Sequence, residues 1–128
     1  MLHKGEWLEI VTKSAFQDKR EGFVMKEQLI AVWEIDEIMK NENAMLVDLR
    51  KAALYNQGHM MGAVNISYDI FFEKTKYLDR SVVLILYCDR GNTSLRVGKI
   101  MGEKGFKVYT VVGGYLAYEY VGRRMCEQ

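Results

Sequence analysis

The chain has 128 residues, of which 49% are hydrophobic and 27% charged, and its formal net charge is +1. This size and composition are typical of one globular domain with its own core. A charge so close to zero gives no electrostatic basis for binding nucleic acid, and no apolar run is long enough to span a membrane. The first residues lack the apolar core of a signal peptide and the two cysteines are far apart. We therefore expect a reducing, cytoplasmic setting rather than a disulfide scaffold.

The first expected element is an amphipathic helix over residues 6–16, where apolar residues recur at helical spacing. The patterns that follow predict strands at 23–25, 29–32, 44–49, 63–66, 82–87 and 107–112, and helices at 33–41, 52–55, 69–76, 95–101 and 115–121. In the helix at 69–76 we expect Ile70, Phe71 and Phe72 to face inward. Strands that alternate with short helices predict an α/β fold with a mainly parallel sheet.

The most informative stretch is residues 87–94, Tyr-Cys-Asp-Arg-Gly-Asn-Thr-Ser, which follows a buried strand and precedes a helix. Cys88 is thus expected on a turn where open α/β sheets place ligands and where helix N-termini stabilise anions. Such a position favours the thiolate, which is the nucleophilic form of cysteine. Gly91 permits a positive φ, and Ser94 or Thr93 is expected to cap the helix. Simple burial of Cys88 in the core is the alternative.

Four segments, in the right order, resemble motifs of the rhodanese family. Residues 46–50 resemble its strand ending in Asp-Val-Arg, and residues 55–66 resemble its Gly-His-Ile-Pro-Gly-Ala-x-Asn-Ile segment. Residues 88–94 resemble its active-site loop, often Cys-Arg-x-Gly-x-Arg-Ser, and residues 112–115 resemble its Gly-Gly-aromatic turn. The match covers residues 29–120. It implies a rhodanese-like α/β fold with a central, mainly parallel five-stranded sheet and helices on both faces.

The chain departs from the family pattern at several positions. Met61 stands where the family usually has proline, and Leu54 where an acid commonly precedes the aromatic residue. Asp89 and Thr93 stand where basic residues are frequent, so Arg90 is the cation left in the loop. A less cationic loop weakens the case for a small dianion such as thiosulfate as the natural donor.

The resemblance implies a rhodanese-type sulfurtransferase, acting on thiosulfate or a persulfide, in which Cys88 is catalytic. Cys88 would take sulfane sulfur from the donor as a persulfide and pass it to a thiol or cyanide acceptor, and a protein acceptor fits the same chemistry. No organic cofactor is expected. The implied substrate-binding loop consists of Asp89, Arg90, Gly91, Asn92, Thr93 and Ser94. We expect its N–H groups to hold the persulfide charge and Arg90 to attract the anionic donor or the acceptor.

Three further residues lie in the matched motifs. Asp48 and Arg50 follow a strand toward the site, and we expect them to support the site rather than to react. His59 suits a general base, but we expect a structural role in its Gly-His turn. Cys126 is expected to be a free thiol near the C-terminus. Two histidines and two cysteines without paired spacing predict no metal site.

Two alternatives stay open beside the enzyme: a non-catalytic docking or regulatory module, and a thiol-redox protein that uses Cys88 with Cys126. A phosphatase or arsenate reductase is disfavoured because it needs an arginine six residues after the cysteine, where Ser94 stands. Residues 29–128 are assigned to the rhodanese domain, and residues 1–28 to an N-terminal extension, a helix plus a short strand packed on it. We expect neither nucleic-acid nor membrane partners, and a monomer or homodimer.

Overall fold

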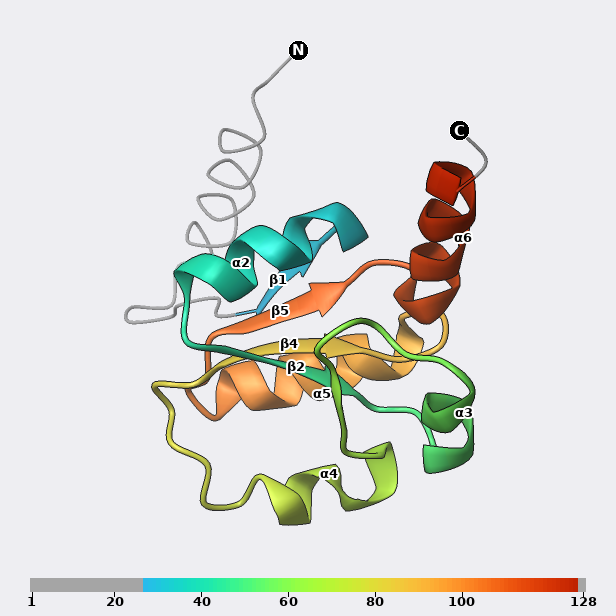
Figure 1. Ribbon diagram of the computed structural model, residues 1–128. Coiled ribbons are helices and arrows are strands. Elements are labelled where there is room, and N and C mark those ends of the chain that lie inside the picture. Colours follow the sequence, from blue (N-terminus) through green and yellow to red (C-terminus); the bar gives the residue numbers. More distant parts are fainter. Residues whose placement is uncertain (1–26, 127–128) are drawn as a thin grey trace.

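The computed structural model describes residues 27–126, which form a five-stranded sheet with the order β1-β5-β4-β2-β3 (Figure 1). Its strands are β1 (Glu27–Ile30), β2 (Ala44–Asp48), β3 (Val64–Asn65), β4 (Val83–Tyr87) and β5 (Val108–Val111). Every pairing between these strands is parallel. The predicted fold class, with helices on both faces of the sheet, is confirmed.

At least one helix lies between each strand and the next along the chain, as parallel pairing of strands requires. The helices are the 3-10 helix η1 (Val32–Glu34) and the α-helices α2 (Ile35–Asn41), α3 (Ala52–Gln57), α4 (Tyr68–Lys74), α5 (Asn92–Glu103) and α6 (Gly114–Cys126). In Figure 1, α4 and α5 lie on one side of the sheet and α2 on the other, while α3 and α6 lie near the carboxyl ends of the strands. Within residues 27–126, no helix has the length and apolar composition needed to cross a bilayer.

The central strand β4 is buried on both faces, which explains its uninterrupted apolar sequence. Successive side chains of a strand point to opposite faces, so Leu84 and Leu86 pack into one cluster and Ile85 and Tyr87 into the other. All four side chains are fully buried. A strand held in this way gives the residue after it, Cys88, a fixed position.

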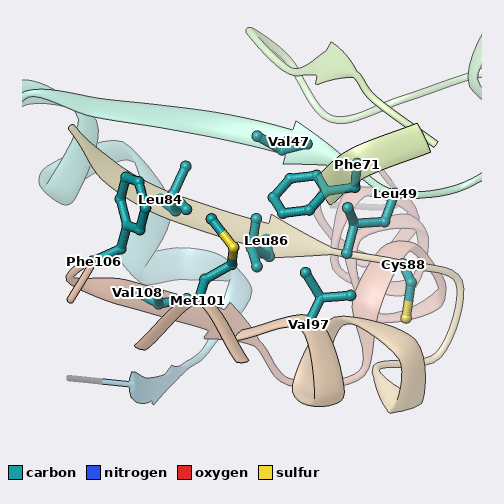
Figure 2. Packing of buried hydrophobic residues seen from close by; sticks show 10 residues of the cluster. All are labelled: Val47, Leu49, Phe71, Leu84, Leu86, Cys88, Val97, Met101, Phe106 and Val108. Atoms are coloured by element: carbon teal, nitrogen blue, oxygen red, sulfur yellow. The ribbon is translucent and has the colours of Figure 1, made fainter. Parts of the chain in front are cut away.

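Cys88 forms the end of the first cluster (Figure 2), in which buried side chains from β2, β4, β5, α4 and α5 meet. Its other members are Val47, Leu49, Phe71, Leu84, Leu86, Val97, Met101, Phe106 and Val108. The second cluster lies on the opposite face and gathers residues of β1, α2, α6 and the turn after α3. The reactive residue expected from the sequence is therefore attached to the core and not to a separate surface loop.

Several predicted element boundaries shift in the structure. The strand expected at 29–32 lies at Glu27–Ile30, because the Glu34 carboxylate accepts the N–H of Ala31 at 2.7 Å and the chain turns there into η1. The strand expected at 63–66 shortens to Val64–Asn65. The helix expected at 6–16 and the strand at 23–25 lie outside the described residues. The expected boundary between residues 28 and 29 falls inside β1.

The expectation that Ile70, Phe71 and Phe72 all face inward is wrong for Ile70. Three consecutive residues of an α-helix span most of its circumference, so one of them must face away from the sheet. Phe71 is fully buried and Phe72 packs partly against the first cluster, whereas Ile70 is 43% exposed. The helix α4 thus covers the sheet mainly through Phe71.

Candidate active site

Cys88 lies directly after β4, between the carboxyl end of the central strand and the N-terminus of α5. Cys88 is buried, with 7% of the residue exposed. Figure 2 shows its sulfur directed toward the turn that begins α5. Both predicted features of the position, the strand end and the helix start, are present.

Backbone N–H groups of the loop converge on the Cys88 sulfur. The N–H of Gly91 donates to Sγ at 3.1 Å and that of Ser94 donates at 3.4 Å. The thiol in turn donates to the Ser94 hydroxyl at 3.4 Å. Two N–H dipoles aimed at one sulfur stabilise negative charge on it. The arrangement can therefore hold a thiolate or any anion built on Cys88.

Gly91 gives the loop its shape. Its φ of 105° lies in the left-handed region, which side chains other than glycine rarely adopt. The residue is the N-cap of α5, and no side chain caps this helix. The expected capping role of Ser94 or Thr93 is therefore wrong, because α5 begins at Asn92 and both residues already lie in its first turn. Ser94 instead donates its hydroxyl to the Gly91 carbonyl at 3.2 Å.

The six loop residues differ in exposure. Asp89, Arg90 and Asn92 are exposed, Gly91 and Thr93 are half-buried, and Ser94 is fully buried. The exposed charged side chains thus stand at the surface beside Cys88, whereas Ser94 lies against the sulfur from within. The predicted loop therefore has a buried side, formed by Ser94, and an exposed outer rim, formed by Asp89, Arg90 and Asn92.

The start of α6 holds the backbone of the loop from the other side. The N–H of Tyr115 donates to the Cys88 carbonyl at 2.9 Å, and that of Leu116 donates to the Asp89 carbonyl at 3.1 Å. A Cβ on Gly114 would collide with both of these carbonyl oxygens. The Gly-Gly pair was visible in the sequence as a turn, but its contact with the Cys88 backbone was not predicted. The sequence did not reveal that Gly114 must lack a side chain because the backbone of Cys88 and Asp89 lies so close to it.

Asp48 and Arg50 form a buried ion pair at the end of β2. The Arg50 guanidinium donates Nη2 to the Asp48 carboxylate at 2.7 Å and Nε at 3.1 Å. Burial disfavours the charged guanidinium, but the hydrogen bond with Asp48, the charge of Asp48 and the nearby Tyr87 hydroxyl together outweigh it, so the pKa of Arg50 lies above its ordinary value. Arg50 also donates to the Gly58 carbonyl at 2.7 Å. Both groups are thus fully engaged in structural contacts.

Tyr87 extends this pair toward the rest of the core. Its hydroxyl donates to Asp48 at 2.7 Å and accepts the N–H of Met60 at 3.1 Å. Burial raises the pKa of the Tyr87 phenol far above its ordinary value, so the hydroxyl keeps its proton. The Arg50 guanidinium lies 4.1 Å from the ring centroid of Tyr115, the residue whose N–H holds the Cys88 carbonyl. The pair therefore reaches the Cys88 backbone through Tyr115 and has no hydrogen bond to the sulfur.

His59 takes no part in this arrangement. Its ring is exposed, stacks on Tyr55 with a centroid distance of 3.8 Å, and places Nδ1 3.0 Å from the Tyr55 carbonyl. These contacts fix the turn after α3. Among residues 27–126, no group of three or more His, Cys, Asp or Glu side chains is arranged to hold a metal ion.

Comparisons with known proteins agree with the fold and with the motifs. A family model described as "Rhodanese-like domain" matches residues 32–120. The thiosulfate sulfurtransferase GlpE of Coxiella burnetii is 28% identical over 92 residues, which cover 71% of this chain and 86% of the relative. The putative sulfurtransferase YtwF of Bacillus subtilis is 32% identical over 84 residues, covering 66% of this chain and 82% of the relative.

Longer proteins contain a similar stretch. The tRNA uridine(34) hydroxylase of Hamiltonella defensa is 30% identical over 98 residues, which cover 71% of this chain but 28% of that protein. Among solved structures, a rhodanese-related protein of Thermoplasma volcanium has a TM-score of 0.67 at 23% identity, covering 74% of this chain and 93% of that one. The family match extends over more than half of the sequence, and the chain therefore belongs to the rhodanese-like domain family.

Proposed function

We propose that this chain is a sulfurtransferase that carries sulfane sulfur on Cys88 as a persulfide. The observation that carries the proposal is the pair of N–H groups, from Gly91 and Ser94, that donate to the Cys88 sulfur. A nucleophilic cysteine needs its thiolate stabilised, and these dipoles do so without a metal ion. Relatives named as sulfurtransferases that the chain matches over most of their length support the same class.

The proposed reaction has two half-reactions joined by one covalent intermediate. In the first, the Cys88 thiolate attacks the outer sulfur of thiosulfate or of a persulfide. The sulfur–sulfur bond of the donor breaks, its electron pair leaves with sulfite or with the donor thiolate, and a new bond joins Cys88 to the transferred sulfur. In the second, cyanide or a thiolate attacks that outer sulfur, and the Cys88 thiolate leaves. No net oxidation of the protein occurs.

The loop and its supports have distinct roles in this proposal. The backbone of residues 89–94 holds the charge of the persulfide, and Arg90 at the outer rim attracts an anionic donor or acceptor. Asp48 and Arg50 position the Cys88 backbone through Tyr115, since neither forms a hydrogen bond with the sulfur. The cytoplasmic location and the monomeric or homodimeric state stay predictions from the sequence.

The rival functions make different demands on the site. An oxyanion-binding phosphatase needs a guanidinium at the sixth position after the cysteine, which here is the fully buried Ser94. A thiol-redox protein needs a disulfide between Cys88 and Cys126, and a docking module needs no reactive thiol. The structure favours the sulfurtransferase over the docking module because Cys88 receives N–H donors that a purely structural thiol does not require.

Steady-state kinetics with thiosulfate and cyanide, and with an organic persulfide and a thiol, test the proposal. We expect parallel lines in double-reciprocal plots, the pattern of a covalent intermediate. Cys88→Ser should have no activity, whereas Cys126→Ser should retain that of the unmodified protein. Equal activity of the Cys88→Ser variant would exclude the proposed role, and dependence on both cysteines would favour the redox alternative.

A further inference from the structure

Asp89 and Arg90, the two charged residues of the loop after Cys88, have opposite charges that sum to zero. Asp89 and Arg90 directly follow Cys88, and both are exposed. The backbone of Asp89 is fixed, because its carbonyl accepts the N–H of Leu116 at 3.1 Å. Adjacent Cα atoms are about 3.8 Å apart, which keeps the Asp89 carboxylate within about 10 Å of the Cys88 sulfur. This is about one Debye length at moderate ionic strength, so the carboxylate acts on any ion that reaches the sulfur.

Two apolar side chains border the same loop. Leu116, whose N–H binds the Asp89 carbonyl, is 56% exposed. Val112, also 56% exposed, precedes Gly113, whose nitrogen would lie 3.4 Å from a Cβ on Gly91. Exposed apolar groups that border this loop can bury part of an organic substrate but gain nothing from a small hydrated dianion.

We propose that Cys88 takes sulfur from organic persulfides of low charge in preference to small inorganic dianions such as thiosulfate. This inference rests on the proposed sulfurtransferase function and names the donor class of the same site. With a neutral donor, Cys88–S⁻ and R–S–S–H give Cys88–S–S–H and R–S⁻, and no charged donor has to approach the thiolate. With thiosulfate, Cys88–S⁻ and S–SO₃²⁻ give Cys88–S–S⁻ and SO₃²⁻, so two negative charges must approach both the thiolate and Asp89.

The test measures the second-order rate constant for sulfur uptake by Cys88, followed by intact mass, with two donors. One is thiosulfate, with two negative charges, and the other is the hydropersulfide of N-acetylcysteine methyl ester, which carries at most the one charge of its persulfide group. Asp89→Asn should raise the thiosulfate rate constant about threefold at low ionic strength, and Asp89→Lys, which changes the charge by two units, should raise it about tenfold. Near physiological ionic strength the gain should shrink to about threefold for Asp89→Lys and to less than twofold for Asp89→Asn, and the organic donor should respond less than twofold to either change.

Three further variants separate the effects of local charge and of apolar contact at the loop from effects elsewhere on the protein. Glu103→Gln removes one negative charge, as Asp89→Asn does, but at the far end of α5. It should leave the rate constants for both donors unaltered. Leu116→Ser should slow uptake from the organic donor about threefold, through lost apolar contact. Ile100→Ser, which changes an exposed apolar residue on α5 and not on α6, should leave that rate constant unaltered.

The outcomes distinguish this inference from the function on which it rests. If no donor loads sulfur onto Cys88 in the unmodified protein, the proposed function fails. If sulfur is loaded but the thiosulfate rate constant is the same in Asp89→Lys as in Glu103→Gln, only the preference for low-charge donors is overturned. The same conclusion follows if Asp89→Lys accelerates both donors equally.

Discussion

At the scale of single residues, the Cys88 sulfur has more polar contacts than a packed thiol requires. Two N–H groups donate to it, and its own hydrogen points to Ser94. Once Cys88 is ionised it can no longer donate, and the Ser94 hydroxyl is free to turn from the Gly91 carbonyl toward the sulfur. The Gly91 carbonyl keeps a partner in that state, because it also accepts the N–H of Leu95 at 3.1 Å.

Ser94→Ala tests this contribution of the hydroxyl. The variant keeps both N–H donors, so we expect the rate constant for sulfur uptake to fall by less than tenfold, and the free energy of unfolding to fall by about 1 kcal/mol. Thr93→Ala, a change in the same turn at a half-buried position, should alter the rate less. Complete loss of activity in Ser94→Ala would show that the backbone donors are insufficient without the hydroxyl.

Tyr87→Phe tests the buried polar group beneath the site. Removing the hydroxyl leaves the N–H of Met60 and one oxygen of Asp48 without this partner inside the core. We expect urea denaturation to show a loss of about 2 kcal/mol in the free energy of unfolding. Because no hydrogen bond joins Tyr87 to the sulfur, the folded variant should still take up sulfur. A stability equal to that of the unmodified protein would contradict the account of this network.

At the scale of elements, the site is the junction of β4, α5 and the start of α6. The two helices meet the loop through backbone groups: α5 through the N–H of Ser94 and α6 through those of Tyr115 and Leu116. The position of Cys88 therefore depends on how closely α6 can approach the loop.

Gly114→Ala tests that approach directly. The added methyl group would collide with the carbonyl oxygens of Cys88 and Asp89, at a residue whose φ is +57°. We expect thermal denaturation to show a loss of about 3 kcal/mol or more, together with slower sulfur uptake by the folded fraction. Gly62→Ala is the matched control, since Gly62 also has a positive φ (+84°) but nothing lies within 4 Å of the added atom. Gly62→Ala should lower the free energy of unfolding by about 1 kcal/mol without affecting sulfur uptake. Equal effects of Gly62→Ala and Gly114→Ala would show that the contact with the carbonyl oxygens is not the cause.

The elements also show what the sequence alone can predict. The apolar run of β4 and the turn residues after it predicted the strand, the turn and the position of Cys88, because burial and turn chemistry are local properties. The cap of α5 was misassigned, because Gly91, not a hydroxyl side chain, occupies the N-cap. The contact of α6 with the Cys88 carbonyl was not predicted, since it joins residues far apart in the chain.

At the scale of the whole molecule, two polar clusters connect the sheet with its helices at different places. Asp48, Arg50 and Tyr87 lie at the carboxyl end of β2 and β4, beside the site. Glu42, just after α2, accepts from Lys107 at 2.7 Å and from the Tyr109 hydroxyl at 2.6 Å, at the amino end of β5. The family resemblance predicted Asp48 and Arg50 of the first cluster, but neither the part that Tyr87 plays in it nor the second cluster, which involves no shared motif.

The second cluster gives stability a dependence on pH. Burial tends to raise the pKa of Glu42, but the hydrogen bonds from Lys107 and Tyr109 outweigh it, so the pKa lies below the ordinary value of 4.5. A lowered folded-state pKa stabilises the fold above the unfolded-state value, and this contribution is lost as the pH falls through the folded-state value. Glu42→Gln should therefore lower the free energy of unfolding by about 0.5 kcal/mol at pH 7.

Urea denaturation from pH 7 to pH 3 checks this expectation. The difference between Glu42→Gln and the unmodified protein should shrink as the pH falls below about 4.5, because protonation then removes the same charge from the unmodified protein. In a Lys107→Gln background, Glu42→Gln should lower the free energy of unfolding by a smaller amount. A difference that stays constant down to pH 3 would show that the charge of Glu42 is not responsible.

The measurement that tests the central claim most directly is intact-protein mass spectrometry after brief exposure to thiosulfate and, separately, to an organic persulfide. We predict a gain of one sulfur atom that requires Cys88, persists in Cys126→Ser and is removed by cyanide or by a thiol. No gain from either donor, with Cys88 also inert to alkylating reagents, would contradict the account and would identify Cys88 as a structural thiol in a docking domain.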